Sequence, residues 1–149
     1  MKIYLFLLTA LFCACSGSGT LKYESEITSV VDDFAGRYFN LDYPASVKYC
    51  TSESSCLLKF YASNVGEKEI EILRNQSEPA SCEVEDVVMI NDTSALAKCR
   101  VSGFLDISDI EQPKVISSDV IFEVPVVCRQ GRWLVKMESP LQSEKQSRD

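Results

Sequence analysis

Seven cysteines are the residues of this chain with the most chemistry open to them, because the sequence contains no histidine. Thiols can form disulfides, bind zinc or carry a lipid. Zinc sites are built from closely spaced pairs such as C-x2-C, completed by further Cys or His ligands. No such pair occurs among these cysteines, so we expect no metal site; they stand at positions 13, 15, 50, 56, 82, 99 and 128.

The spacing of the cysteines favours one local disulfide. A hairpin that turns at residues 91–93 would leave Cys82 and Cys99 about three positions out of register, too far apart to bond without a bulge. Cys50 and Cys56 lie at an expected corner between two helices. We therefore expect the disulfide at Cys50 and Cys56, and we expect buried free thiols elsewhere.

The N-terminal segment reads as an export signal. Lys2 precedes an apolar run over residues 3–12, which has the length of a secretory signal and is too short to span a bilayer. Residues 11–15, "LFCAC", resemble the lipobox of bacterial lipoproteins, in which the cysteine is acylated and becomes the first residue of the mature chain. Residues 1–14 are then a signal peptide, Cys15 is the lipidation site, and residues 15–24 are a flexible tether rich in serine and glycine.

Cleavage by ordinary signal peptidase after Ser16 is the alternative, and it would release a soluble secreted domain. The lipoprotein resemblance implies secretion across the inner membrane. Ser16 stands directly after the cysteine and no acidic run follows. Both features are similar to outer-membrane lipoproteins that face the periplasm.

The charge of the chain excludes some partners. The net charge is −7, and the basic residues are scattered. This net negative charge repels a phosphate backbone, and the sequence has no basic patch that would bind anionic lipid headgroups. We expect no nucleic-acid partner, and membrane contact only through the N-terminal lipid.

A helical first half and a strand-rich second half must position any site. Apolar residues of 24–39 recur with helical spacing, with Ser25 as the N-cap, and two helices follow after Asp42 and Thr51. Residues 67–73 alternate like a strand but are helix formers. Strands are expected over 82–90, 94–104, 115–128 and 133–137, with Pro125 at an edge or a bulge.

This order of elements predicts one α+β domain over residues 25–138, with N-terminal helices packed on one face of a curved antiparallel meander. Residues 139–149 are polar and are expected to form a disordered tail.

Three segments in this order carry a family resemblance: "FAGRYFNLDYPASVKYCT", "EVEDVVMINDTSALAKCRV" and "VPVVCRQGRWLVKM". They are similar to the cystatin-like roll of the nuclear transport factor 2 and ketosteroid isomerase superfamily, and especially to its small bacterial lipoproteins. The resemblance covers residues 25–138. It implies a strongly curved sheet around a long helix, with a conical pocket between them.

Five side chains are candidates to line such a pocket: Tyr38, Tyr61, Asp86, Phe122 and Trp133. Asp86 alternates with Val84 and Val88, so it could point inward and act as the single carboxylate base that ketosteroid isomerases use. A bulge near Val88 would instead turn Asp86 to solvent. The aromatic side chains could equally be core residues.

The sequence contains no convincing catalytic constellation, metal site or cofactor motif. We therefore expect a non-enzymatic, lipid-anchored periplasmic binding or accessory domain whose ligand is unknown. One alternative is a pocket enzyme with a single carboxylate base. Another is an interaction protein that inhibits a partner or forms a homodimer through the sheet face, which exposed apolar residues such as Ile121 and Val127 would favour.

Overall fold

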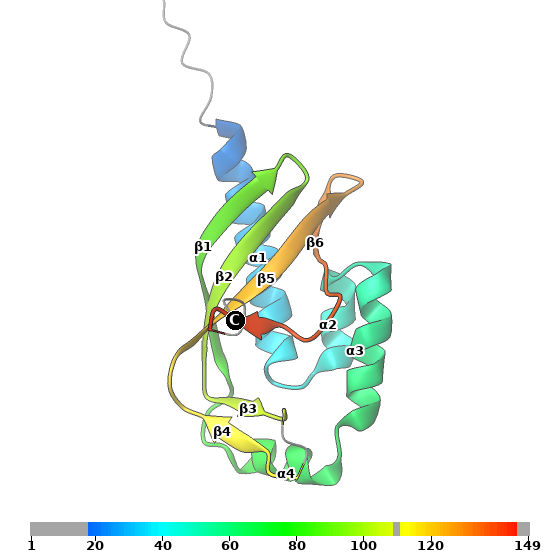
Figure 1. Cartoon of the computed structure of the whole chain (residues 1–149), viewed down its shortest axis with the longest axis vertical. Coiled ribbons are helices and arrows are strands. Elements are labelled where there is room, and N and C mark those ends of the chain that lie inside the picture. Colours follow the sequence, from blue (N-terminus) through cyan, green and yellow to red (C-terminus); the bar gives the residue numbers. More distant parts are fainter. Residues whose placement is uncertain (1–17, 109–110, 146–149) are drawn as a thin grey trace, which may run out of the picture.

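Helix α1 (Ser18–Tyr38) packs against the sheet and the following helices (Figure 1). The structure is a computed structural model that describes residues 18–108 and 111–145. The predicted apolar stripe is confirmed, because Val31 and Phe34 are completely buried on one face of the helix. The helix starts before the expected N-cap at Ser25, so residues 18–24, expected to be part of the tether, are helical. This stretch contains one glycine and no proline that would stop the helix. Cys15 lies outside the described residues.

Short helices follow α1 and are fixed by local caps. The Asp42 carboxylate accepts a hydrogen bond from the Ala45 N–H at 3.3 Å and caps the first of them. The ambiguous segment 67–73 is helical, because the Glu69 carboxylate accepts a hydrogen bond from the Gly66 N–H at 2.8 Å. These elements are α2 (Tyr43–Ser46), the 3-10 turn η1 (Val47–Tyr49), α3 (Ser52–Asn64) and α4 (Glu67–Asn75).

The second half forms an antiparallel sheet with the strand order β1-β2-β5-β6, and β7 also pairs with β5. Helix α1 lies across one face of this sheet (Figure 1). The predicted α+β class, with helices packed on one face of a curved antiparallel sheet, is confirmed. The strands are β1 (Ser81–Asn91), β2 (Ser94–Ser102), β5 (Val120–Arg129), β6 (Arg132–Val135) and β7 (Gln142–Ser143), with β3 (Phe104–Asp106) and β4 (Lys114–Ile116) in a separate two-stranded sheet.

The expected strand over residues 115–128 is divided into β4 and β5. Gly103 has a φ of 69° and donates its N–H to the Ile116 carbonyl at 2.8 Å, which turns the chain from β2 into the small sheet. The tail also differs from the prediction. Residues 142–143 form β7 beside β5, and Leu141 is buried.

Pro125 lies in β5, an inner strand of the sheet, although the sequence predicted an edge or a bulge. Its carbonyl accepts a hydrogen bond from the Lys136 N–H at 2.9 Å, so its nitrogen faces the same side of the strand. On that side the pairing with β6 ends at Val126 and the pairing with β7 begins at Glu123. The missing N–H therefore falls in the gap between two partner strands, where no ladder bond is lost.

The side chain of Asn40 joins the helical half to the sheet half. Its amide oxygen accepts from the Ala80 N–H at 2.8 Å, and its amide nitrogen donates to the Ala80 carbonyl at 3.3 Å. The same nitrogen also donates to the Gly36 carbonyl at 2.7 Å. One side chain therefore fixes the end of α1 against the residue that precedes β1.

We expect Asn40→Ala to lower the free energy of unfolding by about 2 kcal/mol, because it removes three hydrogen bonds at a partly buried junction. Urea unfolding followed by the fluorescence of Trp133, which is 4% exposed, measures the change. The matched control is Asn64→Ala, whose amide donates at an exposed site to Phe60 within its own helix. Equal losses in the two variants would contradict a special role for Asn40.

Candidate functional site

Three tyrosines from different helices meet beneath the sheet. The ring centroids of Tyr38 and Tyr43 lie 5.4 Å apart, and those of Tyr43 and Tyr61 lie 5.7 Å apart. The buried Tyr61 hydroxyl has no hydrogen-bond partner among the described residues. Burial raises the pKa of Tyr43 to about 12, and it raises the pKa values of Tyr38 and Tyr61. These phenols are neutral at neutral pH, so they can donate hydrogen bonds but cannot serve as bases there.

Phenylalanines continue this aromatic cluster toward β5. The Phe39 ring lies 4.6 Å from Phe122 and 5.6 Å from Phe104, and it also contacts Tyr38 at 5.1 Å. Three of the predicted lining residues, Tyr38, Tyr61 and Phe122, are thus brought into one cluster. Their rings pack on neighbouring rings as core side chains do.

Trp133 and Asp86 lie apart from this cluster. Trp133 is buried and makes an edge contact with the Tyr23 ring at 6.0 Å. Asp86 is exposed, because the pairing of β1 with β2 shifts between Val84 and Asp86. The extra residue changes which face the side chains occupy, so Val84 packs against the core while Asp86 points away. Of the two directions that the sequence left open for Asp86, the structure shows the one toward solvent, so this carboxylate lacks the burial that an isomerase-type base would need.

An apolar hollow of about 470 Å³ lies where the corner after α1 meets α3 and α4. None of the five predicted residues lines it. Six of its lining side chains are apolar, namely Leu41, Pro44, Ala62, Val65, Ile70 and Leu73, and the polar ones are Asn40, Asp42 and Arg74. Asn40 and Asp42 are already engaged in hydrogen bonds with backbone groups. Arg74 supplies the positive charge of the lining.

The sequence did not indicate this hollow, because its residues come from three separate segments of the chain, 40–44, 62–65 and 70–74. Ile70 is the lining residue that stands out in the sequence, because it lies on a helix rich in charged residues. Its side chain is 38% exposed. A single exposed apolar residue is common on protein surfaces, so this signal alone does not predict a binding site.

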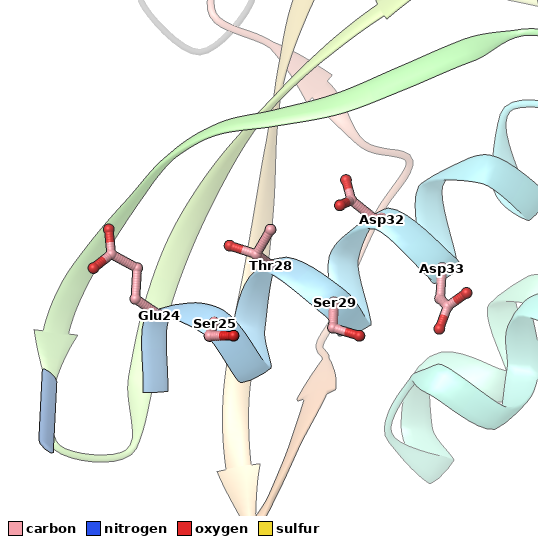
Figure 2. Close-up of a pocket in the computed structure, with 6 residues that line it drawn as sticks. All are labelled: Glu24, Ser25, Thr28, Ser29, Asp32 and Asp33. Atoms are coloured by element: carbon pink, nitrogen blue, oxygen red, sulfur yellow. The ribbon is translucent and has the colours of Figure 1, made fainter. Parts of the chain in front are cut away.

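A second hollow of about 730 Å³ runs along α1 and is lined by hydroxyl and carboxylate side chains (Figure 2). All six drawn residues belong to this one helix: Glu24, Ser25, Thr28, Ser29, Asp32 and Asp33. The Asp32 carboxylate accepts from the Val84 N–H at 3.2 Å, and burial raises its pKa. Among residues 18–108 and 111–145, no group of three or more Cys, Asp or Glu side chains is arranged to hold a metal ion.

The predicted disulfide between Cys50 and Cys56 is not formed. Cys50 is buried, donates its thiol to the Val47 carbonyl at 3.2 Å, and forms a bridge with Val135 of β6. Cys56 is exposed on α3. The two side chains thus lie in different environments on either side of the start of α3. All five cysteines of the described region are free thiols.

Comparison with known proteins gives one similar solved structure. The sequence matches no protein-family profile and no curated protein sequence. The fold is similar to that of a ketosteroid isomerase-like protein from Erwinia carotovora atroseptica SCRI1043, with 11% identity and a TM-score of 0.48. The match covers 80% of this chain and 98% of that chain. Identity and TM-score this low carry no argument about function.

Within the described part of the chain, no helix is both long and apolar enough to cross a bilayer.

The buried phenol of Tyr43 should make stability depend on alkaline pH. In the unfolded chain a tyrosine loses its proton near pH 10, whereas folded Tyr43 keeps it to about 12. Between these values the folded state binds more protons, so the free energy of unfolding falls as pH rises.

We expect the difference in stability between wild type and Tyr43→Phe to change by about 1–2 kcal/mol between pH 9.5 and 11.5, because the variant lacks this contribution. Urea unfolding at each pH measures it. Tyr23→Phe, which changes a residue that is 43% exposed, is the matched control and should keep the wild-type slope. Parallel slopes for wild type and Tyr43→Phe would contradict the burial of this phenol.

Proposed function

We propose that this protein is a non-enzymatic, lipid-anchored binding or accessory domain of the periplasm. The observation that carries the binding role is the apolar hollow between the corner after α1 and the helices α3 and α4. Its six apolar side chains suit the hydrophobic body of a small molecule. Arg74, which forms no salt bridge with another described residue, suits an anionic head group.

A binding role accords better with this hollow than catalysis does. Among the residues that line the hollow, Asp42 carries the carboxylate, and this carboxylate caps α2. General base catalysis needs a carboxylate within reach of a substrate proton and in an environment that tunes its pKa. A small amphipathic molecule, with an apolar body and an anionic head, is the ligand class we propose.

The anchor is supported by residues 11–15 and by the serine and glycine residues that follow. Acylation of Cys15 would hold the domain at a membrane. An acylated chain that faces the periplasm would carry the hollow at the far end of α1, away from its N-terminus, since the hollow is lined by residues from 40 onward. The ligand would then be met in the aqueous space.

Self-association through the outer face of the sheet is a second candidate. Val88, Leu96 and Pro125 lie opposite one another on three adjacent strands, and Val88 is 47% exposed. Ile90, at the end of β1, is 67% exposed. Ile121 and Val127, also on this face, are half-buried. An apolar row of this kind could pair with the same row of a second copy.

Replacing Cys15 tests the anchor. We expect Cys15→Ser to move the protein from the membrane fraction to the soluble fraction, because serine cannot accept the thioether-linked lipid. The intact mass of the extracted protein should show a wild-type chain that begins at Cys15 and carries acyl groups. Cys13→Ser is the matched control and should remain acylated. An unmodified soluble wild-type chain beginning at Gly17 would support cleavage after Ser16 and refute the anchor.

Ile70→Asn tests the apolar hollow. With 1-anilinonaphthalene-8-sulfonate as an apolar anionic probe, we expect affinity to fall about tenfold, because a branched apolar contact is replaced by a polar one. Fluorescence titration measures the dissociation constant. Val88→Asn, at a comparably exposed position on the outer sheet face, should leave affinity unchanged. Loss of binding in Val88→Asn but not in Ile70→Asn would indicate that the probe binds to the sheet face.

A further inference from the structure

Two irregularities in β1 bring a pair of cysteines together. The pairing of β1 with β2 shifts between Met89 and Asn91, and it shifts again between Val84 and Asp86. After both shifts Cys82 lies opposite Val101, and Cys99 lies opposite Val84. The sequence alone predicted a separation of about three positions, which would place the two cysteines on opposite faces. The observed separation of two positions places them on the same face.

The side chains of this diagonal pair are neighbours. The two thiols lie close enough for each to shift the pKa of the other, and both pack in the core beneath the sheet. We propose that Cys82 and Cys99 form a disulfide across β1 and β2 when the folded protein meets a small-molecule disulfide. A diagonal pair on one face of adjacent strands lies at the edge of disulfide reach, so a small movement of the edge strand β1 brings the two sulfurs to bonding distance.

The two thiols differ in access. Cys82 is half-buried on β1, which is an edge strand, whereas Cys99 is completely buried on β2. The nearby Cys99 thiol lowers the pKa of Cys82, and the nearby Cys82 thiol raises the pKa of Cys99. Burial and the nearby Asp32 carboxylate act against ionisation of both. Cys82 is therefore the thiol that attacks an outside disulfide, and Cys99 is the thiol that completes the bond.

Both steps are thiol–disulfide exchanges. The Cys82 thiolate attacks one sulfur of glutathione disulfide, breaks its S–S bond and releases one glutathione thiolate. The Cys99 thiol then attacks the Cys82 sulfur of this mixed disulfide and releases the second. The protons of the two protein thiols pass to the two released thiolates, so one disulfide is consumed and one is formed.

The other described cysteines lack such a neighbour. Cys50 and Cys56 differ in burial, as described above, and Cys128 lies opposite Trp133. The proposal therefore concerns one pair, and it does not depend on the proposed anchor or ligand. In the test the oxidant is supplied in solution, so a soluble chain serves as well as a lipidated one.

Peptide mapping tests the pair in the full chain with every cysteine present. The folded protein is incubated with glutathione disulfide, its remaining thiols are alkylated, and tryptic peptides are weighed. We expect residues 75–100 to be lighter by about 2 Da than in the reduced form, whether intact or as two joined peptides, and to resist alkylation. Peptides 49–59 and 115–129, which hold Cys50, Cys56 and Cys128, should contain no bond between protein thiols, and the exposed Cys56 should be alkylated or carry glutathione.

Single variants test the order of the steps. In Cys99→Ala, Cys82 should accumulate as a mixed disulfide with glutathione. It should react at least about tenfold faster than Cys99 does in Cys82→Ala. Cys128→Ala is the matched control and should keep the bond. Full alkylation of Cys82 and Cys99 after oxidation of the natural chain would overturn the proposal, as would a bond within peptide 49–59.

Discussion

The structure depends on one side-chain amide, that of Asn40, which bonds both backbone groups of Ala80. The two halves of the chain fold with different periodicities. Helix α1 can bury its apolar stripe only if the start of β1 is aligned with the C-terminal end of the helix. A side-chain amide matches the donor and acceptor of a peptide unit, so Asn40 extends the hydrogen-bond pattern of the sheet onto the end of a helix. Leu41 takes a positive φ of 59° directly after it, and the chain turns into α2.

Aromatic packing follows from this junction. Because Asn40 holds the corner, Tyr38 and Phe39 on one side and Tyr43 on the other enter the space beneath the sheet. The roll architecture that the sequence resembles predicts a pocket in this space. Here rings occupy it, and the apolar hollow lies instead outside the corner, against α3 and α4. The same few residues therefore separate a packed interior from a surface that remains open.

The sequence predicted the elements better than the directions of their side chains. The stripe of α1 and the hairpin at residues 91–93 follow from periodicity and turn residues, which are local properties. The pair Cys82 and Cys99 was misplaced, and the direction of Asp86 was left open, for one shared reason. Each depends on the shifts in β1, and one extra residue exchanges the two faces of a strand. The sequence did not predict the hollow around Ile70, since it forms only where three separate segments of the chain meet. Cys50 and Cys56 were judged by their spacing, which does not say that one points into the core and the other into water.

The bond from the Val84 N–H to Asp32 bears on how this chain behaves at high concentration. Among the described strands β1 pairs only with β2, so it presents an open edge to which another polypeptide could add as a further strand. Asp32 occupies one of its donors from the adjacent helix, the shift beside Val84 breaks the straight line of the edge, and Glu83, Glu85 and Asp86 place negative charge along it. Edge strands protected in this way resist the growth of intermolecular sheets, so the irregularity that brings two thiols together also guards the protein against aggregation.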